Sequence, residues 1–142
     1  MPLEKLEFAA HGIVWGSAIY HLCIGIPSMI SLRVTRAMVL KLYKLQIPEV
    51  NDPKFEYAVK PLGAFAIFTS LLCFRAVLAV DEGFFRFMCL ALIVLFMLRA
   101  VLRLIYRDLV FAAFAVGFRR NLVNIAFNTL ISGVLFLYLI RD

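Results

Sequence analysis

Three arginines at four-residue spacing are the side chains of this chain best suited to bind an anion. Arg99, Arg103 and Arg107 stand at positions i, i+4 and i+8 of the segment 98–108, LRAVLRLIYRD. An α-helix has 3.6 residues per turn, so the three guanidinium groups project from one face of it. A guanidinium binds a carboxylate or phosphate bidentately, and in a membrane segment arginine faces protein, a water-filled cavity or the headgroup layer. The spacing therefore predicts a ladder that faces an anion or a partner. The alternative is that these arginines extend to the headgroup layer and pair with Asp108, Asp52 or Glu56.

Further basic and amide side chains are predicted to join this ladder. The segment 33–60 is rich in arginine and lysine, and Asn124 and Asn128 share one face of the last apolar segment. Such a polar stripe packs inward and bonds to other helices, or it lines a ligand cavity. The predicted ligand-binding residues are Arg33, Arg36, Lys60, Arg99, Arg103, Tyr106, Arg107, Asn124 and Asn128.

The histidines and cysteines do not follow a metal-binding pattern. His11 and His21 lie ten positions apart, which separates them by about 15 Å along one helix and prevents both from binding one metal ion. A single-histidine site or a site shared between subunits stays open, and the alternative is a hydrogen bond between helices. The cysteines, Cys23, Cys73 and Cys89, lie in apolar surroundings without CxxC spacing, so no metal is predicted.

The elements that must position these groups are apolar helices. The chain has 142 residues, 64% of them hydrophobic, and its mean hydropathy is +0.95. The apolar residues come in blocks long enough to cross about 30 Å of hydrocarbon as helices. We therefore predict a single domain, residues 1–142, with an all-α fold: an integral membrane four-helix bundle. The predicted spans are 8–32, 61–80, 84–105 and 121–140.

Two basic connectors, 33–60 and 106–120, set the predicted topology. The first is expected to extend the first helix beyond the bilayer, and a second helix is expected to begin at Pro53 with Asp52 as its N-cap. The piece 109–118 is too short to cross and is expected to be interfacial, re-entrant or a prolongation of the third helix. Because basic loops favour the cytoplasm, we place both connectors there and both termini on the other side. The net charge of +6 thus indicates topology and not nucleic-acid binding.

A pair of glycines marks the predicted packing face of the first span. Gly12 and Gly16 form a GxxxG pattern, which lets membrane helices approach closely. We expect this face to pack against another helix or against another copy of the chain. Pro27 is expected to kink the same helix, and Ser28 to bond the carbonyl that the proline frees.

Three short segments resemble the MAPEG superfamily, membrane proteins of eicosanoid and glutathione metabolism. SLRVTRA at 31–37 is similar to the arginine-bearing end of the family's first helix, and NDPKFEYAVK at 51–60 to its DPxFERxxRA entry to the second. The RLIY of 103–106 is similar to an R-x-x-Y late in the third helix. The segments keep the family's order and cover most of the chain. The resemblance implies four spans, a trimer and glutathione as cofactor.

The chain departs from the family where glutathione is held. Family enzymes carry an arginine in the second-helix motif, followed by an asparagine and a glutamate; Lys60, Ala64 and Ile67 stand at these positions. A helix without the amide and the carboxylate cannot make the same hydrogen bonds to a tripeptide. After the R-x-x-Y, Leu109 and Val110 replace the usual Gly-Tyr.

These observations predict a non-catalytic member that binds membrane lipids or a protein partner through a basic cytoplasmic-face site, as a homo-oligomer or as a subunit of a larger membrane complex. The alternative is a glutathione-dependent transferase or isomerase acting on a lipophilic substrate, with Arg103 and Tyr106 as the candidate catalytic residues. No serine or cysteine has an adjacent base that would make it a nucleophile. A second alternative, a small transporter or channel subunit, follows from the polar residues inside the spans.

Overall fold

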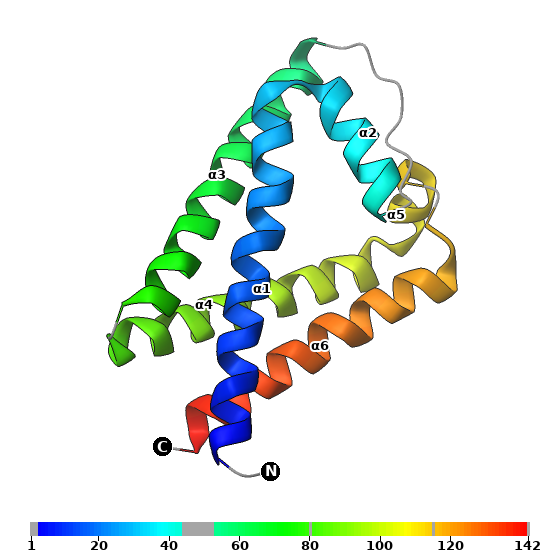
Figure 1. The fold of residues 1–142 in the computed structure, drawn as a ribbon. Coiled ribbons are helices and arrows are strands. Elements are labelled where there is room, and N and C mark those ends of the chain that lie inside the picture. The colour runs from blue at the N-terminus through cyan, green and yellow to red at the C-terminus, as the bar shows by residue number, and fades with distance from the viewer. Residues whose placement is uncertain (1–2, 44–52, 80, 115, 142) are drawn as a thin grey trace.

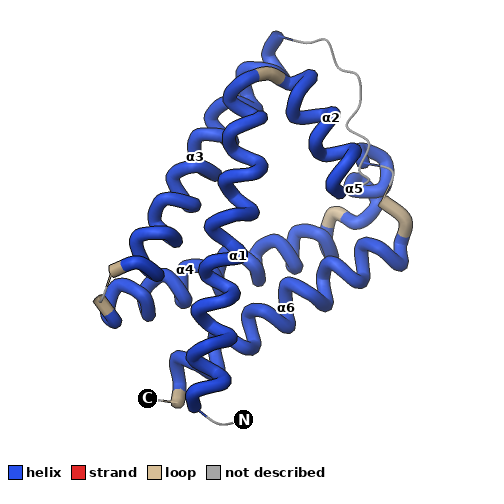
Figure 2. The backbone as a smooth tube through the Cα atoms, viewed as in Figure 1, coloured by secondary structure: helices blue, strands red, loops and turns tan. Residues whose placement is uncertain are grey.

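The described part of the chain is helical throughout. The computed structural model describes residues 3–43, 53–79, 81–114 and 116–141, and within these ranges it contains six helices and no strand (Figure 2). This confirms the all-α prediction. The helices are α1 (Leu3–Ile30), α2 (Leu32–Tyr43), α3 (Pro53–Leu78), α4 (Glu82–Ile105), α5 (Arg107–Phe114) and α6 (Phe118–Ile140).

Four of these helices are long and apolar enough to cross a membrane. The candidate spans lie close to the predicted ones, because long apolar blocks form helices wherever they are shielded from water. Helix α3, which the sequence analysis predicts as the second helix, begins at Pro53 as predicted. Its predicted N-cap, Asp52, lies outside the described residues. The side of the membrane on which the termini lie stays a prediction. The candidate spans run Glu4–Ile30, Val59–Leu78, Glu82–Ile105 and Phe118–Ile140.

The long helices form two antiparallel pairs that cross each other. Helix α1 packs along α3, and α4 packs along α6 (Figure 1). The pairs meet near the two chain termini and diverge toward the end that carries α2 and α5. We call the first the closed end and the second the open end. The arrangement is thus two crossing pairs and not four aligned helices.

The closed end holds the apolar core. Several of its buried residues are alanines and cysteines, whose small side chains let the helices approach one another closely. At the rim, the Arg86 guanidinium donates a hydrogen bond to the backbone oxygen of Leu139 at 2.8 Å and ties α4 to α6. The core residues at this end are Leu6, Ala10, Val14, Cys73, Ala76, Phe85, Met88, Cys89, Leu92, Leu135 and Tyr138.

Two glycines lie in tight contact between α1 and α3. A Cβ atom on Gly25 would lie 2.8 Å from the backbone oxygen of Gly63, and one on Gly63 would lie 2.8 Å from the Cβ of Ser28. Farther along the pair, the buried Ser70 hydroxyl donates to the backbone oxygen of Ala18 at 2.7 Å. Gly12 and Gly16, in contrast, have no atom within 4 Å of an added Cβ. Within the described chain, the predicted GxxxG pair is therefore not a helix-packing contact.

The end of α1 differs from the prediction in two details. The first connector does not extend α1 in a straight line, because α1 ends at Ile30 and α2 turns back toward α5 (Figure 1). The Ser28 hydroxyl donates to the backbone oxygen of Ile24 at 2.8 Å. The carbonyl that Pro27 leaves without its helical donor is that of Cys23, four residues earlier, so Ser28 bonds a different carbonyl from the one predicted.

A second break separates α4 from α5. Tyr106 is the C-cap of α4 and has φ −101° and ψ 31°, outside the helical region. The chain then resumes as the eight-residue helix α5, which begins at Arg107. The segment predicted to be interfacial, re-entrant or a prolongation of the third helix is therefore largely a separate short helix after a bend.

Candidate anion-binding cleft

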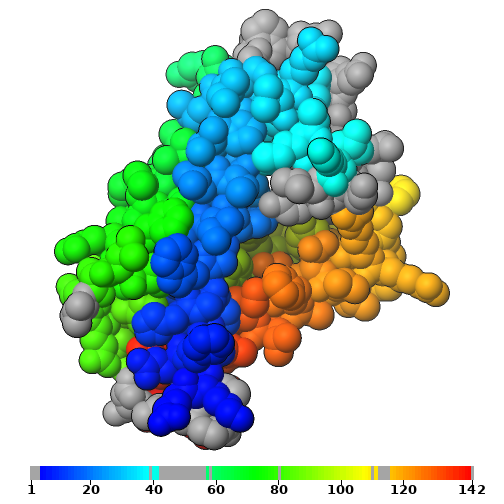
Figure 3. All heavy atoms as spheres, viewed as in Figure 1, coloured from blue at the N-terminus to red at the C-terminus, as the bar shows by residue number. Residues whose placement is uncertain are grey.

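A cavity of about 760 Å³ opens between α1, α4 and α6, where the helix pairs diverge. In Figure 3, α4 lies set back between the surfaces of α1 and α6. The volume lies within the range of about 300–1,000 Å³ that is usual for pockets that hold small molecules. We call this cavity the cleft. The described residues that line it are Ala9, Gly12, Ile13, Gly16, Ser17, Tyr20, Ile24, Phe96, Arg99, Arg103, Arg120, Asn124, Phe127, Asn128 and Ile131.

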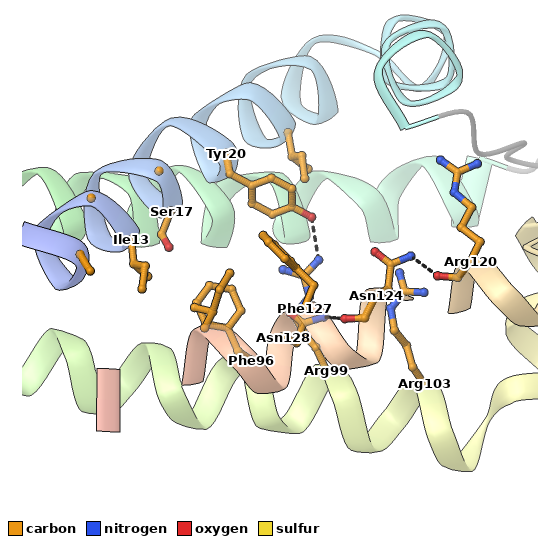
Figure 4. Close-up of a pocket in the computed structure, with 15 residues that line it drawn as sticks. Ile13, Ser17, Tyr20, Phe96, Arg99, Arg103, Arg120, Asn124, Phe127 and Asn128 are labelled. Atoms are coloured by element: carbon orange, nitrogen blue, oxygen red, sulfur yellow. Dashed lines mark hydrogen bonds between the residues drawn. The ribbon is translucent and has the colours of Figure 1, made fainter. Parts of the chain in front are cut away.

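Two arginines of the ladder face the cleft because they continue the buried stripe of α4. Leu92 and Phe96 are buried, and Arg99 and Arg103 follow them on the same helix face at three- and four-residue steps. At the closed end this face packs into the core. At the open end the same face borders the cavity, and the arginine side chains line it (Figure 4).

Arg99 is held by a tyrosine from the opposite wall. Its Nη2 donates a hydrogen bond of 2.7 Å to the hydroxyl of Tyr20, and its guanidinium carbon lies 5.3 Å from the centre of the tyrosine ring. The bond joins α4 to α1 across the cleft (Figure 4). Because a guanidinium carries five N–H donors, Arg99 keeps further donors for an anion.

Arg103 is held by the first turn of α6. Its Nη1 donates to Oδ1 of Asn121 at 3.1 Å, and Nδ2 of Asn121 donates back to the backbone oxygen of Arg103 at 3.1 Å. Asn121 is buried, which makes this reciprocal pair a rigid link between the end of α4 and the start of α6. The guanidinium is thereby fixed beside Arg99, one helical turn away.

The asparagine stripe of α6 bonds mainly within its own helix. Asn124 donates through Nδ2 to the backbone oxygen of Arg120 at 2.9 Å, and Asn128 donates to the backbone oxygen of Asn124 at 2.6 Å. In both bonds the amide Nδ2 points to a backbone oxygen of its own helix (Figure 4). The hydrogen-bond donors that the cleft offers to an anion are therefore chiefly those of its arginines.

The electrostatic character of the cleft is strongly positive. Among the described residues that line it, three are arginines and none is acidic. Neither Arg99 nor Arg103 forms an ion pair with a carboxylate in the described part of the chain. Half-buried positive charges without a counter-ion are costly in a low-dielectric setting. The cleft is therefore complementary to an anionic group.

The other part of the cleft is apolar. Ile13, Phe96 and Ile131 line it on the side of the closed end, and Figure 4 shows Ile13 and Phe96 displaced along the helices from Arg103 and Arg120. The cleft is therefore amphipathic along its length, cationic toward the open end and apolar toward the closed end.

The predicted ladder is divided by the bend at Tyr106. Arg99 and Arg103 lie before the bend and line the cleft, whereas Arg107 lies after it. The Nε of Arg107 pairs with Oδ1 of Asp108 at 3.4 Å, with both side chains exposed to solvent. Arg107 does not line the cleft, and the break at Tyr106 makes the prediction of three arginines on one continuous helix face wrong for its third member. The pair with Asp108 is one that the alternative interpretation expected.

The remaining predicted site residues fall into two groups. Asn124 and Asn128 line the cleft together with the two arginines. The other four do not line it: two lie on α2, one on α3 and one at the end of α4. These four are Arg33, Arg36, Lys60 and Tyr106.

The histidines and cysteines form no metal centre in the described residues, where no group of three potential ligands occurs. The ring of His11 stacks on Phe85 with centroids 4.1 Å apart. The Nδ1 of His21 lies 2.7 Å from the backbone oxygen of Ser17. This hydrogen bond is within α1. The interpretation that His21 forms a hydrogen bond between helices is therefore wrong. Cys73 and Cys89 are buried as expected, whereas Cys23 is exposed.

Tyr20 and Arg120 line the cleft although neither belongs to the set of predicted ligand-binding residues. The predicted topology places Arg120, with Arg119, only on the same membrane face as the ladder. Tyr20 follows Gly16 by four residues, and Gly16 follows Gly12 by four, so one helix face carries all three. That spacing was a readable signal. For Arg120 the signal was only its place in the Arg-Arg pair before the last span.

Comparison of the chain with protein-family models, curated proteins and solved structures finds no match. The resemblance to the MAPEG superfamily, and with it the trimer and the glutathione cofactor, stays a prediction that rests on three short segments.

Proposed function

We propose that this protein is a polytopic membrane protein that binds an anionic amphiphile in the cleft, without catalysing a reaction on it. The bound anion is a phosphate or carboxylate group, and the attached chain is apolar. In this proposal the cationic part of the cleft lies at the cytoplasmic headgroup level, where anionic lipids are abundant. Both termini then lie on the opposite side.

The observation that carries the proposal is the pairing of Arg99 and Arg103 in a cleft without a described acidic residue. Arg99 and Arg103 lie in the last two turns of α4, where arginine side chains reach the headgroup level and two adjacent positive charges attract an anion. Tyr20 and Asn121 orient the two guanidinium groups and leave most of their donors to a ligand. A phosphate or carboxylate accepts such donors bidentately.

The chemistry of the lining favours binding over catalysis. The described residues that line the cleft include no His, Cys, Asp, Glu or Lys, so the hydroxyl of Ser17 has no such base in the lining to activate it as a nucleophile. The hydroxyl of Tyr20 accepts a hydrogen bond from Arg99. Tyr106, the candidate for polarising a thiol, lies outside the cleft and is exposed. The thiol-enzyme alternative therefore has less support.

The test compares amphiphiles of equal chain length and opposite headgroup charge. The protein is purified in an uncharged maltoside detergent, and binding of dodecyl phosphate and dodecyltrimethylammonium is titrated by native mass spectrometry. The wild type is expected to retain the phosphate and not the ammonium. In Arg99→Gln and Arg103→Gln, affinity for the phosphate falls about 10- to 100-fold each, since a hydrogen bond to a charged group contributes about 1.5–3 kcal/mol.

Arg107→Gln is the matched control, because Arg107 belongs to the same four-residue repeat but lies outside the cleft. Its affinity is expected to change by less than about twofold, as for an exposed pair. Equal binding of the two amphiphiles by the wild type would overturn the proposal. Binding of glutathione at micromolar concentration, lost in Arg103→Gln, would instead favour the transferase alternative.

A further inference from the structure

We infer that Gly12 and Gly16 form the floor of a channel for a single hydrocarbon chain, which runs from the arginines toward the closed end. This inference rests on the proposed function, since the anionic headgroup fixes where the chain begins. It names the apolar part of the ligand and the residues that set how much of that part the cleft can hold.

The two glycines are open on the side that faces the cleft. An added Cβ would meet no atom within 4 Å at either position, and both residues line the cavity. They stand four residues apart on the face of α1 that also carries Tyr20. Any larger side chain at these positions would therefore project into the cavity and not into a neighbouring helix.

Apolar side chains complete the walls of this channel. Ile13 stands beside the glycines on α1, Phe96 comes from α4, and Phe127 and Ile131 come from α6. Phe96 is 7% exposed and joins the channel to the core at the closed end. The side chains are bulky on α4 and α6 and absent at the two glycines, so the free space lies against α1.

The length and charge of the cleft fit one amphiphile. From Arg120 to Ile131 the cleft follows residues 120–131 of α6, which span about 16 Å at 1.5 Å per residue step. The cationic groups are at the open end of this length and the apolar side chains at the other. A transmembrane helix of another protein would place further apolar residues against Arg99 and Arg103, which leaves their charges without a partner. A lipid chain with an anionic headgroup pairs its headgroup with the arginines and its hydrocarbon chain with the apolar side chains.

The experiment locates the far end of the bound hydrocarbon chain. Dodecyl phosphate with a photoreactive diazirine at its chain terminus is added to the purified protein in maltoside detergent, and the labelled residues are identified by mass spectrometry. In the wild type, label is expected within residues 9–16 of α1 and 127–131 of α6. An uncharged dodecyl analogue with the same diazirine reports the background on lipid-facing surfaces.

Leucine substitutions then fill the channel. In Gly16→Leu and, independently, Gly12→Leu, label in these two segments falls about tenfold or more, because a side chain that occupies the space excludes the ligand. Gly133→Leu is the matched control: an added Cβ at Gly133 also meets no atom within 4 Å, but Gly133 does not line the cleft. Its labelling is expected to stay within about twofold of the wild type.

Three results would overturn the inference while the proposed function stands: label spread as for the uncharged analogue, unchanged label in both leucine variants, or loss of an oligomer in Gly16→Leu but not in Gly133→Leu. The last would assign the glycine face to a contact between copies of the chain. Failure of the proposed function itself is distinct, because the wild type would then not discriminate dodecyl phosphate from dodecyltrimethylammonium.

Discussion

The same helix faces carry buried apolar residues at the closed end of the molecule and polar or charged residues at the open end. On α4, the face that buries Leu92 at the closed end carries Arg99 and Arg103 at the open end. On α6, the face that buries Leu135 carries Asn121 and Asn128 farther toward its start. Both helices therefore change from apolar to polar along one line. The change occurs where the two pairs of helices separate.

The difference shows why the open end does not close. Small residues at the closed end, such as Ala10 and Cys89, let the helices meet. Closing the open end in the same way would bury two guanidinium groups without counter-ions, at a cost of several kcal/mol. In the open arrangement, each guanidinium group instead donates a hydrogen bond, Arg99 to Tyr20 and Arg103 to Asn121.

The largest expected effect comes from placing an arginine, the characteristic residue of the open end, in the apolar core of the closed end. Leu92 is 1% exposed, and Leu92→Arg is expected to cost at least about 4 kcal/mol of folding free energy, because it leaves an unpaired charge in the core. The reverse change, Arg103→Leu, is expected to cost only about 1 kcal/mol, for the lost bond to Asn121. Unfolding in denaturant, followed by circular dichroism, measures both.

The control for this exchange is Leu92→Met, which conserves volume and is expected to cost less than about 1.5 kcal/mol. Similar losses for Leu92→Arg and Arg103→Leu would mean that the two ends do not differ in the way described.

An intermediate effect is expected at the contact between α1 and α3. A Cβ on Gly63 would lie 3.0 Å from the backbone oxygen of Gly25, an atom that cannot move without moving α1. Gly63→Leu is expected to destabilise the fold by about 1–3 kcal/mol. Gly16→Leu, in the cleft, is expected to have no such cost and to gain from better helix propensity, up to about 1 kcal/mol. Thermal unfolding of the two variants side by side tests the contrast, and equal melting temperatures would contradict it.

The smallest expected effect concerns the bond across the open end. Tyr20→Phe removes the hydrogen bond to Arg99 and keeps the contact of the guanidinium with the ring. The loss is expected to be about 0.6 kcal/mol, the average for hydrogen bonds between membrane helices. Tyr106→Phe, at an exposed position outside the cleft, is the control and should leave the unfolding midpoint unchanged. A loss above about 2 kcal/mol in Tyr20→Phe would show that this bond, and not the closed end, holds the pairs together.

The helices and part of the cleft were predictable because their signals are local. Apolar blocks define the four long helices, and the spacing of Arg99, Arg103, Asn124 and Asn128 places these side chains on inner faces. The bend at Tyr106 was not predictable in this way, since neither glycine nor proline marks it. Without that bend, four-residue spacing carries Arg107 into the cleft as well.

The packing of the glycines depended on tertiary structure. The GxxxG pattern drew attention to Gly12 and Gly16, but the helices of this chain approach at Gly25 and Gly63, which belong to different spans. A sequence pattern describes one helix face and does not specify which other helix, if any, covers it. The same limit explains why Tyr20 was not assigned to the site, although its spacing placed it beside the glycines.

Because the core lies at the closed end, a small rotation of a helix pair in the core produces a larger displacement at the open end. Helix α4 has 24 residues, so it is about 36 Å long, and a rotation of about 2° at one end displaces the other by about 1 Å. Displacements of that size are comparable to a change of one methyl group in the core. The width of the cleft is therefore expected to depend on core residues such as Cys89, which do not line it. Substitutions in the core are expected to change the volume of the cleft without altering a residue that lines it.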